Sequence, residues 1–289
     1  CKINDQHFIV TTTTGGAAKV LSDMEEYAQT EWPHLNVFLN SITEQFSTFN
    51  ISGPKSRAIM RKVFSDIDFS NDKFPFMTFK HIKYLDTDAR ILRASFTGEL
   101  GYEIYVRPKY ALDLWEKIFR YGENLGLIPY GTETMHLLRA EKGYIVVGQD
   151  TDGTATPIDM NLNWMIGKNK KDFIGKRSLT RTDTSRSDRK QLVGVLALDK
   201  KRIIEEGQHI VKIKDLPKNI KSPIKYLGHV TSSYHSPNLN HYIAMAMIEG
   251  GNQLVGKNFY VTQNKSSENI AVKIVKPVFL DPDNKRLLS

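Results

Sequence analysis

The sequence predicts an α+β fold in which antiparallel sheets carry helices on one face, followed by an all-β barrel or sandwich. Over residues 7–142, strand-like segments alternate with segments of helical spacing. From Val193 onward, short runs with apolar residues at every second position are separated by turn residues, which predicts an all-β domain of about 100 residues. A chain of 289 residues is longer than one compact core usually is. We therefore expect residues 1–180 to form one region of two subdomains, 181–190 a polar linker, and 191–289 the C-terminal domain.

The N-terminal elements follow from local patterns. A strand-like run at residues 7–10 leads into a segment with helical spacing of its apolar residues: Ala17, Val20, Leu21, Met24 and Ala28. Trp32 and Pro33 end that helix. Apolar runs between turn residues predict four strands: residues 37–39, 46–51, 79–85 and 89–96.

Turn residues connect these strands. Pro54 predicts a helix start, because proline is tolerated in the first turn of a helix. The polar residues 86–88 are expected to form a short turn between the third and fourth of the strands.

Residues 95–106 predict a hairpin with a turn framed by Gly98 and Gly101. In its second strand, apolar residues alternate with polar ones, which puts Glu103 on the face opposite Ile104. If that face is also covered, the carboxylate needs partners, because an unpaired buried carboxylate is very costly. A ligand with paired N–H donors would suit it, and the alternative is a solvated glutamate.

The remaining elements are two helices, a long loop and short strands. Helical spacing predicts helices over residues 110–124 and 132–142, the second ending at Gly143. Residues 149–176 form an irregular passage, and loops of this length are usually functional or disordered. The strands of the C-terminal domain are expected near residues 193–197, 210–213, 229–232, 242–248, 259–262 and 271–278.

Composition bounds the function classes. A net charge of +8 and a pI near 9.3 favour anionic partners: nucleic acid, polyanionic metabolites or an acidic protein surface. Only the net charge supports nucleic-acid binding, so we expect none. One cysteine excludes an intrachain disulfide and a multi-cysteine zinc site and fits a cytoplasmic location. No apolar run approaches a membrane span, and no signal peptide is seen, so we expect no membrane partner.

Several common catalytic and cofactor motifs are absent from the sequence. It contains no G-x-G-x-x-G after a strand, no phosphate-binding loop, no H-E-x-x-H and no G-x-S-x-G. The eight histidines are scattered, and we expect no metal site.

Eight motifs carry a resemblance to a known family. They are TTTTG (11–15), GP (53–54), FPFM (74–77), FTGELGYE (96–103), YGTETM (130–135), LRAEKG (138–143), VGQDTDGT (147–154) and LGHVTS (227–232). With them, the chain resembles the folate-binding aminomethyltransferase family that includes the glycine cleavage T-protein. Within it, the chain is most similar to the C-terminal part of the alpha subunit of heterotetrameric sarcosine oxidase. The resemblance covers essentially the whole chain and implies a C-terminal β-barrel.

The resemblance implies a set of folate-binding residues. In the family, the glutamate matching Glu103 pairs with the pteridine of tetrahydrofolate, as a carboxylate can accept two parallel N–H bonds. The residue matching Phe96 packs beside the ring system, and Trp164 matches a family tryptophan for which core packing is the alternative. Phe279 lies where the family's C-terminal domain closes on the folate.

The resemblance also implies a reaction. A flavin in a partner subunit oxidises sarcosine, and the imine carbon is captured on tetrahydrofolate as 5,10-methylenetetrahydrofolate. Tetrahydrofolate, which can carry a polyglutamate tail, is then the cofactor of this chain. FAD, FMN and NAD are expected only in a missing region or in the other sarcosine oxidase subunits.

Two departures from the family pattern matter. T-proteins have an arginine four residues before the one matching Arg139, and here that position is Met135, which favours the oxidase branch. The family's catalytic aspartate precedes the position of Cys1. We therefore expect a fragment of an enzyme with no catalytic residue in this chain, inactive when alone.

Three other functions stay open. The chain can belong to a dimethylglycine oxidase or dehydrogenase, or to a glycine cleavage aminomethyltransferase. A third alternative, from another class, is a non-catalytic folate-binding regulatory protein, whose K-G-C-Y-x-G-Q-E signature is absent here.

Overall fold

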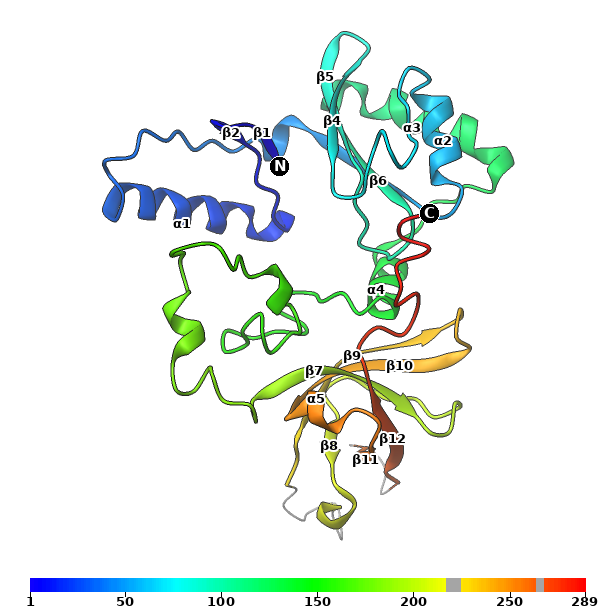
Figure 1. The fold of residues 1–289 in the computed structure, drawn as a ribbon. Helices are drawn as coiled ribbons and strands as arrows, with labels where there is room; N and C mark the ends of the chain where they lie inside the picture. Colours follow the sequence, from blue (N-terminus) through cyan, green and yellow to red (C-terminus); the bar gives the residue numbers. More distant parts are fainter. Residues whose placement is uncertain (217–224, 264–267) are drawn as a thin grey trace. The chain divides into compact units, whose positions relative to one another are not determined.

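The computed structural model describes residues 1–216, 225–263 and 268–289, which pack into two compact units (Figure 1). Unit 1 consists of Cys1–Ser95, Glu99–Pro129 and Arg286–Ser289. Unit 2 consists of Phe96–Gly98 and Tyr130–Lys285. The linker predicted at residues 181–190 separates two sequence domains, and these two units are defined by packing instead. The predicted domain boundary therefore stays a prediction.

Helices and strands have the following bounds. The α-helices are α1 (Ala17–Thr30), α2 (Ser56–Val63), α3 (Ala111–Gly122), α4 (Thr132–Glu141) and α5 (Gly251–Leu254). The strands of unit 1 are β1 (Lys2–Asn4), β2 (His7–Phe8), β3 (Ser47–Ser52), β4 (Phe79–Tyr84), β5 (Thr87–Leu92) and β6 (Gly101–Val106). Those of unit 2 are β7 (Lys190–Ala197), β8 (His209–Val211), β9 (Gly228–Ser236), β10 (His241–Glu249), β11 (Asn258–Val261) and β12 (Ile270–Val275).

Unit 1 is built on a four-stranded antiparallel sheet with the order β3-β6-β5-β4. Side chains alternate between its two faces, and the apolar set of each strand lies on one of them. Ile91 of β5 is paired with Ile104 of β6, and both are fully buried. This face forms the main core of unit 1.

Two amphipathic helices cover that core face and lie side by side in Figure 1. In α2, Ile59, Met60 and Val63 are buried, and in α3 Leu114 and Ile118 are buried. This confirms the predicted antiparallel sheet with helices packed on its core face, here α2 and α3.

The opposite face of the sheet is covered differently. Helix α1 has no fully buried residue, and its apolar side chains face a cavity over this second face of the sheet. Residues 37–39 form no strand, so that prediction is wrong. Phe38 is 91% exposed, and Phe38 and Leu39 instead line the cavity.

The predicted tight hairpin at residues 95–106 is also wrong in its first half. Strand β5 ends at Leu92, and residues 93–100 form a longer connection to β6. The chain leaves the sheet at Arg93, whose buried guanidinium donates to the carbonyl oxygen of Phe74 at 2.7 Å. Gly98 has a φ of +77°, and a Cβ there would lie 2.9 Å from the side chain of Lys142, so this position requires glycine.

Smaller differences concern the turn between β4 and β5. The connection is the two residues Leu85 and Asp86, shorter than the predicted turn at 86–88, and Leu85 has a positive φ of 54°. Thr87 and Asp88 already belong to β5.

Unit 2 contains a closed barrel with the strand order β10-β7-β12-β11-β8-β9. All its pairings are antiparallel, and alternate residues of the strands fill its interior. A barrel, rather than a sandwich, is therefore the C-terminal architecture.

Helix α4 and the irregular passage after it pack against the barrel within unit 2. Ala140 of α4 and Met160 share a buried cluster with Leu192, Ile243 and Met245 of the barrel. The helix ends before Gly143 as predicted, because Gly143 has a φ of +75° and a Cβ there would meet the carbonyl oxygen of Pro277 at 2.6 Å.

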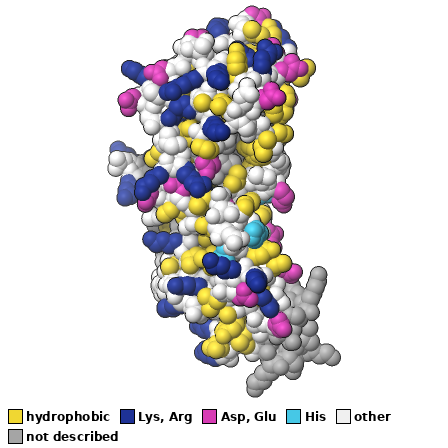
Figure 2. All heavy atoms as spheres, turned by 90° about the vertical axis from the view of Figure 1, so that its right-hand side faces the viewer, with side chains coloured by type: hydrophobic (Ala, Val, Ile, Leu, Met, Phe, Trp, Pro, Cys, Tyr) yellow, Lys and Arg dark blue, Asp and Glu magenta, His cyan; other side chains and the backbone are white. Residues whose placement is uncertain are grey.

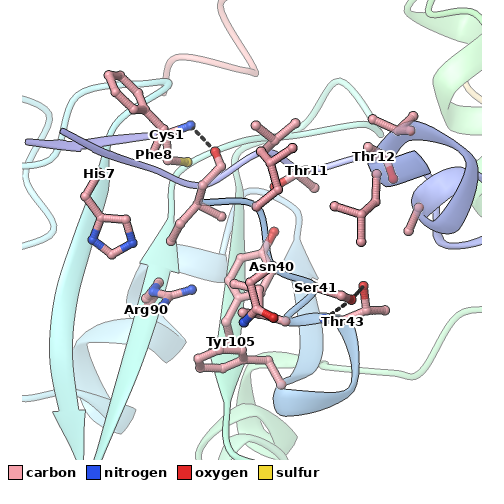
Figure 3. Close-up of a pocket in the computed structure, with 18 of the residues that line it drawn as sticks. Cys1, His7, Phe8, Thr11, Thr12, Asn40, Ser41, Thr43, Arg90 and Tyr105 are labelled. Atoms are coloured by element: carbon pink, nitrogen blue, oxygen red, sulfur yellow. Dashed lines mark hydrogen bonds between the residues drawn. The ribbon is translucent and has the colours of Figure 1, made fainter. Parts of the chain in front are cut away.

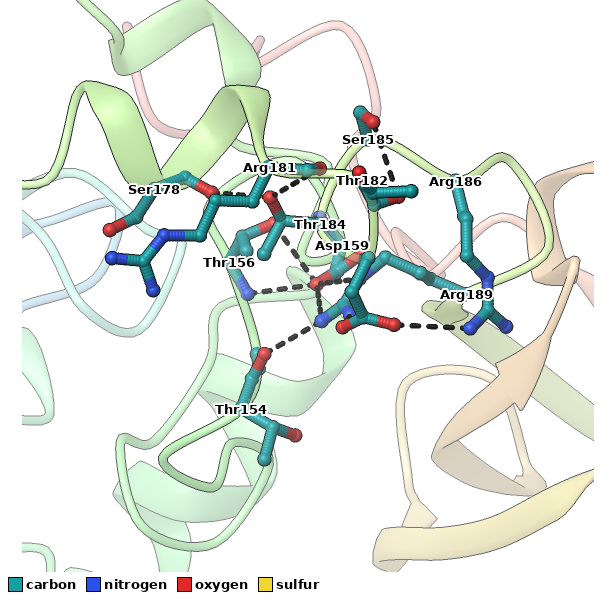
Figure 4. Close-up of polar contacts among 12 residues, drawn as sticks. Thr154, Thr156, Asp159, Ser178, Arg181, Thr182, Thr184, Ser185, Arg186 and Arg189 are labelled. Carbon is teal, nitrogen blue, oxygen red and sulfur yellow. Dashed lines mark hydrogen bonds and ion pairs between the residues drawn. The ribbon is translucent and has the colours of Figure 1, made fainter.

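Ion pairs hold the polar segment that precedes the barrel (Figure 4). Arg189 donates to the carboxylate of Asp159 at 2.9 Å and to that of Asp183 at 2.7 Å. Its Nη2 also donates to the carbonyl oxygen of Thr154 at 2.7 Å. Residues 183–189 are therefore tied to the irregular passage.

Candidate functional site

A cavity of about 560 Å³ lies in unit 1, over the second face of the sheet. Its walls come from the N-terminal segment, from α1, from residues 38–43 and from the sheet (Figure 3). Pockets for small organic ligands usually have volumes of about 300–1,000 Å³. In Figure 3, Arg90 and Tyr105 lie on the sheet side of the cavity, and the segment that carries Thr11 and Thr12 lies across from them.

Strand register arranges the sheet side of this cavity in two rows. In the first row, Tyr105 of β6 is paired with Thr48 of β3 and with Arg90 of β5, and Arg90 is paired with His81 of β4. The second row runs across the sheet in the order Asn50, Glu103, Leu92 and Phe79. Glu103 of β6 is therefore flanked by Asn50 of β3 and Leu92 of β5.

Glu103 is half-buried in the second row. Tyr105 donates its hydroxyl proton to Glu103 Oε2 at 2.5 Å. Among the described residues, no hydrogen bond reaches Oε1. Glu103 does not itself line the cavity, whereas its neighbours Tyr105 and Leu92 do. The described residues thus leave one oxygen of a half-buried carboxylate without a hydrogen-bond donor, on a strand whose Tyr105 lines the cavity.

Tyr105 is held as a neutral hydrogen-bond donor. Burial raises the pKa of Tyr105, and the hydrogen bond to Glu103 raises it further. Thr11 of the N-terminal segment also contacts the Tyr105 hydroxyl. The tyrosine therefore orients the carboxylate and joins the sheet to the opposite wall of the cavity.

Arg90 is a cationic side chain of the cavity wall. Its guanidinium lies 4.5 Å from the ring centroid of Phe46, and the guanidinium of Arg107 lies 4.6 Å from the same centroid. Among the described residues, Arg90 has neither an ion pair nor a side-chain hydrogen bond. Burial lowers its pKa, and repulsion by Arg107 lowers it further.

The three other predicted site residues belong to unit 2. Phe96 is stacked on Tyr144, with ring centroids 6.3 Å apart and an interplanar angle of 22°. Trp164 lies in a short 3-10 helix (Asn163–Met165) and is 72% exposed, so it is not a core residue. Phe279 is half-buried against the cluster around Met245. Their assignment to a folate site stays a prediction.

Phe279 also lines a second cavity, of about 500 Å³, in unit 2. The cavity is largely apolar, with Lys200, Lys276 and His241 as its basic members. His241 is 9% exposed and its Nε2 lies 3.0 Å from the carbonyl oxygen of Ala197. The histidine is thus held by the barrel backbone.

The most deeply buried polar cluster lies where α4 meets the barrel. Arg139 and Asp150 form an ion pair at 2.5 Å, and both side chains are 0% exposed. Thr231 and Ser232 each donate a hydroxyl proton to Asp150 Oδ1, at 2.6 and 2.7 Å. Because the charges are compensated inside this network, it stabilises unit 2 rather than offering a site.

Charge is dispersed over the surface that Figure 2 shows. Lysine and arginine side chains are spread over this face with acidic side chains among them. Within the described ranges, His, Cys, Asp and Glu side chains form no group of three or more suited to a metal ion. None of the helices described is long and apolar enough to span a bilayer.

Two cavity residues were not identified from the sequence. Tyr105 could have been, because it shares a strand face with Glu103 at a spacing of two. Arg90 could not have been identified in this way. Its position beside Glu103 depends on the register of β5 against β6, and the eight-residue connection between these strands does not fix that register in the sequence.

Comparisons with known proteins agree with this architecture. Residues 1–170 match the GCVT N-terminal domain, and residues 190–281 match the glycine cleavage T-protein C-terminal barrel domain. The crystal structure of the glycine cleavage system aminomethyltransferase T from Bartonella henselae has a similar fold, with a TM-score of 0.77 at 21% identity. The matched region covers 92% of the present chain and 67% of the Bartonella henselae chain.

Two curated relatives extend the comparison. The chain is 43% identical over 287 residues to the sarcosine oxidase subunit alpha of Corynebacterium sp. (strain P-1), covering 99% of this chain and 29% of the relative. It is 29% identical to an aminomethyltransferase of Thermoanaerobacter pseudethanolicus, covering 90% of this chain and 70% of the relative. The chain thus spans under a third of the length of the sarcosine oxidase subunit. The two domain matches show that it belongs to the glycine cleavage T-protein family of folate-dependent aminomethyltransferases.

Proposed function

We propose that this chain is the tetrahydrofolate-binding part of a sarcosine oxidase alpha subunit. In this function, the one-carbon unit of the imine made from sarcosine is transferred to tetrahydrofolate, giving 5,10-methylenetetrahydrofolate and glycine. The observation that carries the proposal is similarity to a sarcosine oxidase alpha subunit along 99% of the chain. Met135, in place of the T-protein arginine, supports the same branch.

The donor and acceptor chemistry of Glu103 fits a pterin. A pterin edge presents an amino group and a ring N–H, and a carboxylate accepts two such bonds in parallel. Tyr105 holds one carboxylate oxygen in place, and the described residues supply no hydrogen-bond donor to the other, Oε1. Glu103 would therefore bind and orient the pterin.

The cavity of unit 1 suits a ligand with a flat ring and a polar edge. Its volume lies within the usual range for small organic ligands, and Val20, Leu21 and Met24 of α1 supply an apolar wall. When bound, tetrahydrofolate supplies the two nitrogen atoms that receive the one-carbon unit. The residues of this chain would orient it and exclude water.

Other parts of the reaction belong outside this chain. The oxidation of the amine needs a redox cofactor, and FAD, FMN or NAD would be held by other sarcosine oxidase subunits or by the remaining length of the alpha subunit. Phe96, Trp164 and Phe279 are proposed to contribute aromatic surface to the folate. The positive net charge would favour the anionic, polyglutamylated form of the cofactor.

Titration with folinic acid, a stable folate, tests this proposal. We expect the chain to bind it, and Glu103→Gln to weaken binding by ~1–3 kcal/mol, because the substitution replaces a charged double acceptor and orphans a pterin donor. The measurement is isothermal titration calorimetry.

Glu99→Gln is the matched control. Glu99 belongs to the same TGELGYE motif, but its carboxylate forms an ion pair with Arg286 at 2.9 Å. Its substitution should leave the affinity nearly unchanged. No binding of folinic acid to the chain, or equal losses in both variants, would contradict the proposed role of Glu103.

A further inference from the structure

The cavity of unit 1 contains a cation that the proposed folate contact does not use. Arg90 lines the cavity, and the described residues supply it with no ion pair and no side-chain hydrogen bond. Leaving the charge of a half-buried guanidinium without a counter-ion is unfavourable. A ligand that brings an anionic group into the cavity would relieve this cost.

The surroundings of Arg90 reinforce a preference for an anion. Arg90 and Arg107 lie over the same Phe46 ring, at 4.5 and 4.6 Å from its centroid. Arg107 is bound to Gln45, a neutral partner, at 3.0 Å. The nearby carboxylate of Asp88 is paired with Lys83 at 2.7 Å. Two positive charges thus share one ring, and Asp88, although close enough to attract them, forms its ion pair with Lys83 and not with either arginine.

The geometry of Arg90 suits a carboxylate. A guanidinium that lies over an aromatic ring uses its face for that contact, and its N–H edge stays available for bonds in its own plane. Two parallel N–H donors on that edge match the two oxygens of a carboxylate. Because Arg90 lines a cavity, such a pair would be stronger there than on an open surface.

The position of Arg90 relative to Glu103 indicates which carboxylate this is. Arg90 is paired with Tyr105, so Glu103, two residues earlier on β6, is its diagonal neighbour. Such neighbours are roughly 7–8 Å apart across a sheet. If Glu103 binds the amino edge of a pterin, Arg90 lies beside the same ring system. The glutamyl carboxylates of folate lie beyond the p-aminobenzoyl group and would be too distant.

From these observations we infer that Arg90 anchors the carboxylate of the amino acid whose one-carbon unit is transferred in this cavity. This inference rests on the proposed function and adds to it the residue that selects N-substituted amino acids over simple amines. The bond is a reversible ion pair, with two N–H groups of Arg90 donating to the two carboxylate oxygens. No proton or electron is transferred in this step.

The test uses the full chain saturated with folinic acid and N-methylglycine as the probe. We expect calorimetry to detect binding of N-methylglycine, and Arg90→Gln to weaken it about tenfold or more, since a bond to a charged group is lost. N-Methylglycinamide, which has no carboxylate, should bind weakly to the unsubstituted chain and be insensitive to Arg90→Gln.

Arg107→Gln is the matched control, because Arg107 stacks on the same ring without lining the cavity. It should change the affinity for N-methylglycine by no more than about twofold. Arg90→Lys keeps the charge without the double N–H edge and should give an intermediate affinity. Melting curves establish that each variant is folded.

Three results would overturn the inference. One is an unchanged affinity for N-methylglycine in Arg90→Gln. Another is an equal loss in Arg107→Gln, which would indicate a general effect of charge. The third is a loss in Arg90→Gln of affinity for folinic acid but not for 6-methyltetrahydropterin, which would assign Arg90 to the folate glutamate. Failure of the unsubstituted chain to bind folinic acid would instead refute the proposed function.

Discussion

At the scale of single residues, the pair of Glu103 and Tyr105 is the centre of the proposed site. Both side chains lie on the same face of β6, and the tyrosine hydroxyl donates to one carboxylate oxygen at 2.5 Å. Because the raised pKa of Tyr105 keeps its proton in place, the tyrosine limits the rotation of the carboxylate. We regard Tyr105 as a positioning residue.

The prediction at this scale is that Tyr105→Phe weakens folinic acid binding less than Glu103→Gln does. The loss should be about 0.5–1.5 kcal/mol, the usual net value of one hydrogen bond, because the acceptor itself remains. Calorimetry measures the affinity, and a melting curve establishes that the fold is intact. An affinity equal to that of the unsubstituted chain would show that Tyr105 does not position Glu103.

At the scale of elements, the network between α4 and the barrel holds unit 2 together. Arg139 comes from α4, Asp150 from the irregular passage and Ser232 from β9. Within the described part of the chain, the Nε atom of Arg139 has no hydrogen-bond partner, and Asp150 is the carboxylate that compensates the charge of the buried guanidinium. The network joins three segments that are distant in the sequence.

We predict that Asp150→Ala destabilises unit 2 by ~3–5 kcal/mol, because it leaves the charge of Arg139 buried and unpaired. Hydrogen exchange of the β9 and β10 amides measures the loss locally. Asp152→Ala is the control: Asp152 lies in the same passage but is exposed, and it accepts hydrogen bonds from its neighbours Thr154 and Ala155. A similar change in both variants would contradict the role of the buried pair.

The barrel also has a predicted dependence on pH. Burial lowers the pKa of His229 on β9 below its ordinary 6.5, and Lys190 and His209 lower it further. The unfolded chain therefore binds a proton near pH 6.5, before the folded chain does. The free energy of unfolding should fall as the pH decreases through 6.5 and level off below the folded pKa.

Denaturant unfolding between about pH 7.5 and 5.5 measures this dependence. His229→Gln should reduce the loss of stability at the lower pH. His235→Gln, which removes an exposed histidine of the same strand, should not reduce it. An identical pH dependence in the unsubstituted chain and in His229→Gln would contradict the assignment.

At the scale of the whole molecule, local pattern predicted most elements but not the contacts between them. The period-two pattern put Glu103 opposite Ile104, and the period change after residue 190 marked the barrel. Residues 37–39 were predicted wrongly, because an apolar run forms a strand only when a partner strand is available. The position of Arg90 beside Glu103 depends on long-range register, which local pattern does not contain.

The domains matched by the family models and the two packing units divide the chain at different residues. The family domains match residues 1–170 and 190–281, whereas residues 130–180 pack in the same unit as the barrel. Arg189 fixes the segment at 183–189 to the irregular passage through an ion pair with Asp159. The polar composition of this segment predicted a linker and did not indicate that ion pair. Domain boundaries at 180 and 190 therefore remain predictions.

The most direct test of the central claim is a crystal structure of the chain with folinic acid. We expect pterin density in the cavity of unit 1, with two ring-edge nitrogen atoms within hydrogen-bonding distance of the Glu103 carboxylate and with Tyr105 still bound to Oε2. A pterin bound elsewhere, with Glu103 contacting only Tyr105 and water, would contradict that claim.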